Sequence, residues 1–271
     1  MVAAMSDALA VALSCAHAAG EILASLYRSS DFSIATKSSE IDLVTTADRA
    51  ADEAIVTRLR AAFPDHAILA EESGATAGRQ PGLQWVGDPL DGTTNFPHGV
   101  PHFSVSIGLY DGDRGEVGVV HDPLRGETFC ARRGEGCWLV RSGQDKSPLR
   151  VTPTAQLGRA LLATGFAYTR SDPRQKTNLD EFAATIPKVR GIRRAGSAAL
   201  DLAYVAAGRL DGYWEYHLQP WDTGAGAVLV REAGGIVTTI AGTPWAPTIP
   251  SLAAAGPKLH APLLAHLRQF T

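Results

Sequence analysis

The chain has 271 residues, of which 45% are hydrophobic and 20% charged, so it is long and apolar enough to fold around a sizeable core. Its 25 basic and 28 acidic residues give a formal net charge of −3, which provides no broad attraction to nucleic acid or to an anionic membrane. The three cysteines, Cys15, Cys130 and Cys137, form no C-x-x-C pair, so neither a zinc knuckle nor a disulfide framework is indicated, and a reducing cytoplasm fits.

The first predicted element is a helix near the N-terminus. Apolar residues at Leu9, Leu13, Ala16 and Leu23 recur at the spacing of one helical face. A secretory signal would need a basic leading region, which the first residues lack, and Asp7 interrupts their apolar run. Because that run is short, we expect neither an export signal nor a membrane span.

A second helix and a buried strand are expected next. Thr46 or Asp48 can serve as the N-cap of a helix that stops at Pro64. The short apolar run 67–70 then ends abruptly in Glu71-Glu72. Its length and its flanking residues favour a buried strand with carboxylates at its C-terminal end.

The most informative motif is the run Asp88-Pro89-Leu90-Asp91-Gly92-Thr93-Thr94-Asn95, which follows the apolar lead-in 83–86. Pro89 cannot continue a strand ladder, so we expect the chain to turn as it leaves Asp88. Gly92 permits a close backbone approach, and the two threonines after it can present N–H groups at a helix start. Carboxylates suit hard cations such as Mg²⁺, and such N–H groups suit phosphate. The run therefore predicts metal-assisted phosphate chemistry, although the same residue types are also common in an ordinary acidic turn.

Strong turn signals separate a series of strands after this motif, as in an antiparallel meander. The polar stretch 141–148 is the best candidate for a boundary, which divides the chain into an α+β half, 1–145, and an α/β half, 146–271, within one compact unit. The predicted strands of the first half are 103–110, 115–121, 127–131 and 136–139.

In the second half, strands alternate with helices, which is typical of α/β folds. The predicted strands are 160–164, 191–194, 212–215, 236–239 and 251–255, and the predicted helices are 179–186, 196–207, 221–233 and 258–270.

Carboxylates stand where a strand ends or a helix begins at four places, and singly each would be an ordinary helix cap. Together with their neighbours they resemble the signature of the inositol monophosphatase family, in the right order and across nearly the whole chain. The matching stretches are Asp42-Leu43-Val44-Thr45-Thr46-Ala47-Asp48, Ala70-Glu71-Glu72-Ser73, Asp88 to Phe96, Gly196-Ser197-Ala198-Ala199, Trp221-Asp222 and Glu232-Ala233-Gly234-Gly235.

The resemblance implies a layered αβαβα sandwich, of the type shared with fructose-1,6-bisphosphatase, and a Mg²⁺-dependent phosphomonoesterase. One Mg²⁺ would be held by Glu71, Asp88 and the backbone carbonyl of Leu90. A second would be held by Asp88, Asp91 and Asp222, so that Asp88 bridges the two. Family members can bind a third Mg²⁺ near Glu71, and Mn²⁺ can act as a substitute.

The resemblance also implies roles in catalysis and substrate binding. Glu71 would orient the nucleophilic water, and Asp48 and Thr93 occupy the two positions of a hydrogen bond that helps to polarise it. The backbone N–H groups of Gly92, Thr93 and Thr94 would receive the phosphoryl oxygens. The groups expected to face the rest of the substrate are Asp91, Gly196, Ala198, Glu215 and Asp222, and Lys37 and Glu72 are further candidates for the site.

The chemistry of the reaction leads to the same arrangement. A phosphate monoester dianion repels an incoming nucleophile, so a site must neutralise charge and supply hydroxide at neutral pH. Paired cations do both. No Ser-His-Asp or nucleophilic Cys arrangement competes, and the histidines show no metal-ligand spacing. They are scattered, at His98, His102, His121 and His217 among others.

We therefore expect a cytoplasmic phosphatase, by resemblance a homodimer, that hydrolyses the monoester of a small polyol such as inositol 1-phosphate. Alternative substrates for the same chemistry are fructose-1,6-bisphosphate, histidinol phosphate and 3′-phosphoadenosine 5′-phosphate. A different class of hypothesis is a regulatory protein that binds RNA polymerase or RNA, although the mild negative charge does not favour nucleic acid as a partner. We expect no membrane association.

Two glycines depart from the family's pattern. Gly87 stands before the first metal-binding Asp, where a branched aliphatic residue is usual, and Gly224 stands two residues after Asp222, where Ala or Cys is usual. We expect these glycines to affect metal affinity or loop mobility rather than reaction type.

Overall fold

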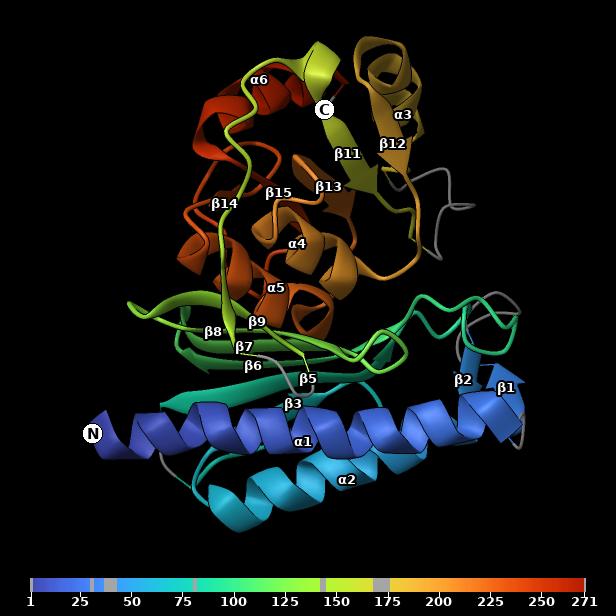
Figure 1. Cartoon of the computed structure of the whole chain (residues 1–271), viewed down its shortest axis with the longest axis vertical. Helices are drawn as coiled ribbons and strands as arrows, with labels where there is room; N and C mark the ends of the chain where they lie inside the picture. The colour runs from blue at the N-terminus through green and yellow to red at the C-terminus, as the bar shows by residue number, and fades with distance from the viewer. Residues whose placement is uncertain are drawn as a thin grey trace.

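The computed structural model describes residues 2–29, 32–36, 43–79, 82–141, 145–167 and 176–270. Within these ranges the chain forms alternating layers of helix, sheet, helix, sheet and helix (Figure 1). The layered αβαβα fold implied by the resemblance is therefore confirmed.

The first layer consists of α1 (Val2–Ser29) and α2 (Thr46–Ala62), which pack together on one face of the larger sheet (Figure 1). The buried face of α1 carries small side chains such as Ala12, Cys15 and Ala19, so the two helices approach closely. Among the described helices, only the segment Ala8–Ser29 is long and apolar enough to cross a bilayer by length and composition. The expectation that this run is too short was wrong, but its apolar face lies against α2 and the sheet.

The larger sheet has eight strands in the order β10-β9-β8-β7-β6-β5-β3-β4. Its pairs are antiparallel except β3 with β5, so the expected meander is confirmed. The strand β10 lies beyond residue 145 yet pairs with β9, and the division of the chain at 145 remains an interpretation. The strands are β3 (Ala67–Ala70), β4 (Gly74–Thr76), β5 (Leu83–Asp91), β6 (Ser104–Asp111), β7 (Arg114–Asp122), β8 (Glu127–Arg132), β9 (Gly136–Arg141) and β10 (Ser147–Leu149).

The middle layer, α4 (Ala198–Ala206) and α5 (Pro220–Glu232), lies between the two sheets (Figure 1). Glycines allow α5 to lie close to the larger sheet. A Cβ on Gly224 would stand 2.5 Å from the Cγ2 atom of Val86, and one on Gly118 would stand 2.5 Å from the backbone oxygen of Ala225. Gly224 thus has a packing role that the sequence did not reveal.

The smaller sheet has five strands in the order β12-β11-β13-β15-β14, and α6 (Pro257–Leu267) packs on its outer side (Figure 1). The strands β12, β11 and β13 are parallel, so their carboxyl ends meet at one edge. The remaining elements are β11 (Leu161–Thr164), β12 (Gly191–Arg193), β13 (Gly212–Tyr216), β14 (Ile236–Thr238), β15 (Ser251–Ala255), α3 (Leu179–Thr185), a small ladder of β1 (Ile34–Thr36) with β2 (Leu43–Thr45), and three 3₁₀ turns at Leu157–Arg159, Ile186–Lys188 and Arg268–Phe270.

Three local predictions were wrong. The strand β5 does not stop at Asp88 but continues through Pro89, because a register shift against β6 accommodates the residue that lacks an N–H group. No helix begins at Thr93, since residues 92–99 form consecutive turns. The N-cap of α2 is Thr45, whose hydroxyl accepts the N–H of Asp48 while the Asp48 carboxylate accepts the N–H of Thr45.

Candidate active site

A cavity of about 560 Å³ lies where the two sheets and the middle helices meet. Its wall includes the end of β5, the carboxyl ends of β11 and β13, and the first turns of α4 and α5. Ligands of α/β proteins commonly bind at such strand ends. Six acids line it, namely Glu71, Asp88, Asp91, Asp201, Glu215 and Asp222, and so do Leu90, Gly92, Thr93, Thr94, Gly196 and Ala198.

The structure thus gathers nearly all the predicted site residues around one cavity. Asp48 is the buried partner of Thr93 behind its wall. Glu72 is not among the lining residues, but its charge is close enough to contribute to the raised pKa of Asp48. Lys37 and Asp42 lie outside the described residues.

The irregular end of β5 aims two carboxylates into the cavity. Asp88 accepts the backbone N–H of Leu90 at 2.9 Å, which stabilises the kink that carries the chain from Asp88 to Asp91. Asp91 in turn accepts the hydroxyl of Ser197 at 2.6 Å and the N–H of Ala199 at 2.7 Å. These bonds to the N-terminus of α4 fix the position of Asp91 relative to the smaller sheet.

Burial and mutual repulsion raise the pKa values of these acids. For Asp88, burial comes first, and the charges of Glu71, Asp91 and Asp222 add to it and raise the pKa well above its usual range. Burial likewise raises the pKa of Asp91 to about 6 against the opposing hydrogen bond from Ser197. The pKa of Asp222 is raised by burial and then by the charge of Asp91. A cavity in which carboxylates repel one another favours a cation.

The Asp48–Thr93 pair predicted from the family resemblance is present. The hydroxyl of Thr93 lies 3.3 Å from Oδ1 of Asp48 and 3.0 Å from the backbone oxygen of Leu90. The other carboxylate oxygen, Oδ2, accepts the Thr45 hydroxyl at 2.5 Å, so the rotamer of Asp48 is fixed. Burial raises the pKa of Asp48 to about 6, against the hydrogen bonds from Thr45.

A tight turn follows Asp91. Gly92 has φ of +108°, which side-chain-bearing residues rarely adopt, and its carbonyl accepts the N–H of Asn95 at 2.8 Å. The Asn95 amide donates to the backbone oxygens of His102 at 2.7 Å and Ala195 at 2.9 Å. Asn95 therefore ties the turn to the segment that leads into α4, a connection that sequence reasoning missed.

Glu215 lines the same cavity from near the carboxyl end of β13. It accepts the hydroxyl of Tyr213 at 2.5 Å, and a Cβ on Gly165 would stand 2.0 to 2.3 Å from its carboxylate atoms. Burial raises the pKa of Glu215 to about 7, against the Tyr213 hydrogen bond and the charge of Arg194. Tyr213 and Gly165 thus support Glu215, whereas in the sequence Tyr213 is only one residue of the predicted strand 212–215.

The donor set fits Mg²⁺, because carboxylate and backbone carbonyl oxygens are the ligands that this cation prefers. Among the described residues, no group of three or more His, Cys, Asp or Glu side chains is already arranged to hold a metal ion. The carboxylates of Asp88, Asp91 and Asp222 turn instead to N–H and O–H donors of the chain, Asp222 accepting the N–H of Gln219 at 2.7 Å. A bound cation would have to draw them together, and it would relieve the repulsion described above.

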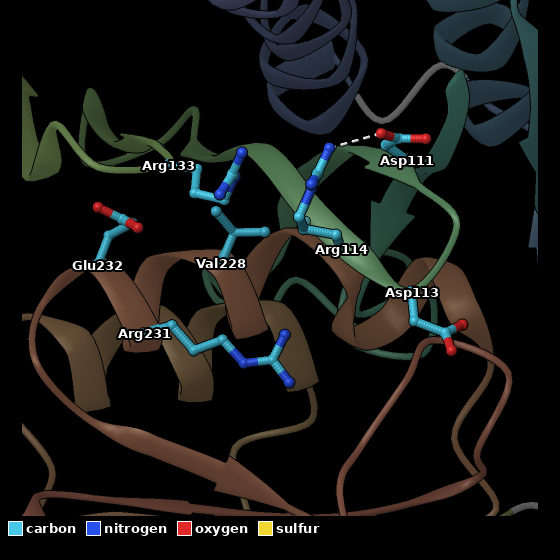
Figure 2. Close-up of a pocket in the computed structure, with 8 residues that line it drawn as sticks. Asp111, Asp113, Arg114, Arg133, Val228, Arg231 and Glu232 are labelled. Carbon is cyan, nitrogen blue, oxygen red and sulfur yellow. Dashed lines mark hydrogen bonds and ion pairs between the residues drawn. The ribbon is translucent and has the colours of Figure 1, made fainter. Parts of the chain in front are cut away.

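A second hollow, of about 500 Å³, lies on another part of the molecule (Figure 2). Two of its arginines pair with acids of the chain. Arg114 lies 2.6 Å from Asp111 and 2.7 Å from Glu116, and Arg133 lies 3.0 Å from Glu116. Glu232 accepts the N–H groups of two glycines, at 134 and 136. None of the predicted site residues lies there.

The histidines behave differently from one another. His121 is buried, shares the Thr128 hydroxyl with His17, and has its pKa lowered by burial to about 4. His217 lines the cavity and has φ of +62°, and its ring nitrogen lies 2.8 Å from the backbone oxygen of Lys176. Sequence reasoning had no signal for this placement.

Comparisons with known proteins agree with the geometry. The model of the inositol monophosphatase family matches residues 4–271. The Nus factor SuhB of Pasteurella multocida is 45% identical over 257 residues, which cover 94% of this chain and 93% of that protein. The crystal structure of the extragenic suppressor protein suhB from Bartonella henselae superposes with a TM-score of 0.89 at 37% identity, covering 98% of this chain and 100% of the other. An inositol monophosphatase from Anabaena (Nostoc) sp. PCC 7120 superposes with a TM-score of 0.86 at 38% identity, covering 97% and 96%.

Proposed function

Because the chain belongs to the inositol monophosphatase family, we propose that it is a Mg²⁺-dependent phosphatase that hydrolyses inositol 1-phosphate or a closely similar polyol monoester. The observation that carries this proposal is the set of acids at the end of β5 and the start of α5, which line one cavity and raise one another's pKa. The solved relative described as an inositol monophosphatase supports the substrate class.

Five residues would hold the cations. Glu71, Asp88 and the carbonyl of Leu90 would bind one, and Asp88, Asp91 and Asp222 a second; all five line the cavity. When bound, Mg²⁺ lowers the pKa of a coordinated water and stabilises negative charge on the leaving oxygen.

The chain's own residues position the water and the phosphate. Glu71 accepts a hydrogen bond from the nucleophilic water. Because the Thr93 hydroxyl donates to Asp48 or Leu90, a lone pair of its oxygen accepts a second hydrogen bond from that water and aligns it. The N–H groups of the turn at Gly92, Thr93 and Thr94 receive the phosphoryl oxygens.

The wall opposite β5 would recognise the rest of the substrate. Glu215 is oriented by Tyr213 and accepts hydrogen bonds from substrate hydroxyls. Gly196 and Ala198 at the start of α4 leave room for a ring, because neither carries a large side chain. The carboxylates of Asp91 and Asp222 would accept further hydrogen bonds from substrate hydroxyls.

A substrate panel tests the proposal. Initial rates would be measured with Mg²⁺ and with EDTA on inositol 1-phosphate, fructose-1,6-bisphosphate, histidinol phosphate and 3′-phosphoadenosine 5′-phosphate. We expect turnover only with Mg²⁺ and the highest kcat/KM for inositol 1-phosphate. A higher kcat/KM for any other member would reassign the substrate, and Mg²⁺-independent turnover would contradict the metal assignment.

A second candidate function is regulatory, because curated relatives carry the name Nus factor SuhB. In this proposal the protein binds RNA polymerase or RNA in the cytoplasm, as a homodimer, in addition to its catalysis. The test is binding of purified RNA polymerase, and separately of RNA, to the wild type and to Asp88→Asn. Equal binding by both would mean that the interaction is independent of the active site, and no binding by either would exclude the role.

A further inference from the structure

One acid of the cavity has no place in the site described so far. Asp201 is only 3% exposed, and it lines the cavity together with Glu215 and Ala198. Within the described part of the chain, its carboxyl makes no hydrogen bond or ion pair. Because this carboxyl faces the cavity and no other group of the described chain holds it, a ligand in the cavity can bind it.

Two other buried acids of the protein have partners that give them a structural role. Asp211 accepts the hydroxyl of Thr152 at 2.6 Å and the N–H of Leu161 at 2.7 Å. Asp122 accepts two backbone N–H groups and pairs with Arg125 at 2.7 Å. These acids stabilise turns and strand starts, whereas Asp201 contributes nothing comparable to the fold.

The position of Asp201 on α4 directs it to the substrate side of the cavity. It stands three residues after Ala198, so both lie on the same face of the helix. The flanking residues Leu200 and Leu202 are fully buried in the core between the sheets. The face shared by Ala198 and Asp201 is therefore the one that α4 presents to a ligand.

The surroundings of Asp201 are compatible with a hydroxyl group as its partner. Burial, then the charges of Glu215 and Asp91, raise the pKa of Asp201 well above its usual range, and the lowering effect of Arg194 is smaller. A carboxyl accepts a hydrogen bond from an alcohol in either protonation state, and when protonated it can also donate one, so a substrate hydroxyl is a suitable partner.

We propose that Asp201 is a specificity-determining residue that exchanges hydrogen bonds with a substrate hydroxyl remote from the phosphate, and so selects polyol monoesters. This inference rests on the proposed phosphatase function. It adds to Glu215 a second recognition group at the same cavity, contributed by a different element. A substrate without hydroxyls would leave Asp201 unpartnered and gain nothing from it.

The experiment compares kcat/KM for inositol 1-phosphate with kcat/KM for p-nitrophenyl phosphate, which carries no hydroxyl, in wild type, Asp201→Ala and Asp201→Asn. We expect Asp201→Ala to lower the inositol-to-aryl ratio by about tenfold to a hundredfold, mostly through KM. Asp201→Asn should restore most of the ratio, because an amide also donates and accepts.

Thermal unfolding separates this role from a structural one. Because the Asp201 carboxyl has no partner, neither variant should lower the melting temperature. The matched control is Asp211→Asn, a buried acid of the same half that does not line the cavity. It should lower the melting temperature and leave the substrate ratio at the wild-type value.

Each result has a distinct meaning. An unchanged inositol-to-aryl ratio in Asp201→Ala would overturn the inference. So would a lower ratio in a variant whose melting temperature falls as much as that of Asp211→Asn. So would a variant Asp201→Asn that loses histidinol phosphate turnover selectively, since that would identify a cationic partner. A wild type that hydrolyses p-nitrophenyl phosphate with Mg²⁺ but does not prefer inositol 1-phosphate would overturn this inference alone. If neither substrate shows Mg²⁺-dependent turnover, the proposed function itself fails and this inference with it.

Discussion

The stability of the metal-free protein should fall as the pH rises through about 6, and Mg²⁺ should reverse this loss. Burial raises the pKa of Asp48 and of Asp91 from 3.8 to about 6. The folded chain therefore holds these protons more tightly than the unfolded chain does. The stability that these two protonated acids contribute to the folded state is fully present below about pH 4 and is lost between about pH 4 and pH 6.

The size of the effect follows from these pKa values. Raising the pKa of one carboxyl from 3.8 to about 6 corresponds to about 3 kcal/mol of folding free energy, so the two acids represent several kcal/mol as an upper bound. A cation bound at about a hundred times its Kd adds about 2.7 kcal/mol. For a chain of this length, that corresponds to a rise of about 5–10 °C in melting temperature.

The assay is thermal unfolding between pH 5 and pH 8, with EDTA or with saturating Mg²⁺ at matched ionic strength. We expect a large Mg²⁺-induced rise in melting temperature at pH 8 and a small one at pH 5, where protons compete for the same carboxylates. Asp88→Asn serves as the control and should lose most of the rise at pH 8. An equal Mg²⁺ effect at both pH values, or a metal-free melting temperature that does not fall between pH 5 and pH 6, would contradict this prediction.

Substitutions at four further positions test individual contacts. Thr93→Val removes the hydroxyl that bonds Asp48 and should lower kcat by about a hundredfold, and Thr93→Ser should retain most of the wild-type kcat. If steady-state assays give Thr93→Val the same kcat as the wild type, the water-aligning role is excluded. Gly165→Ala places a methyl group against the carboxylate of Glu215 and should raise KM for inositol 1-phosphate more than it lowers kcat. An unchanged KM would contradict this prediction. Gly224→Ala should lower the free energy of unfolding in urea by about 1–3 kcal/mol, because the new Cβ would meet Val86. Gly87→Ala, whose Cβ would meet nothing closer than 3.7 Å, should leave that free energy unchanged or raise it by about 0.5–1 kcal/mol. A larger loss of stability in Gly87→Ala than in Gly224→Ala would contradict the packing role of Gly224.

Much of the fold could be predicted because its patterns are local. The turn signals that separate 103–110 from 115–121 correctly indicated the β6–β7 hairpin. The alternation after residue 160 correctly indicated an α/β arrangement, in which β12, β11 and β13 are parallel. The end of β5 was mispredicted because the missing N–H group of Pro89 usually ends a ladder, whereas here a register shift absorbs it. That shift depends on the partner strand, which no single segment reveals.

The site was predictable where residue type and spacing carry the chemistry. The pair Asp88 and Asp91 could be named from the sequence, and the structure places both at one cavity. Asp201 could not, because in the sequence it is one polar residue within an apolar helix. Gly165 was missed for a similar reason, since its importance depends on a close approach to Glu215, which is 50 residues away in the chain.

Metal-dependent hydrolysis by the acids of the cavity can be measured directly. Phosphate release from inositol 1-phosphate would be followed against Mg²⁺ concentration for the wild type, for Asp88→Asn and for Asp113→Asn, an acid of the second hollow. We expect a saturable Mg²⁺ dependence in the wild type and in Asp113→Asn, and a loss of more than about a hundredfold in Asp88→Asn. If Asp88→Asn retains Mg²⁺-dependent turnover at the wild-type rate, Asp88 does not bridge the cations and the account of the site is wrong.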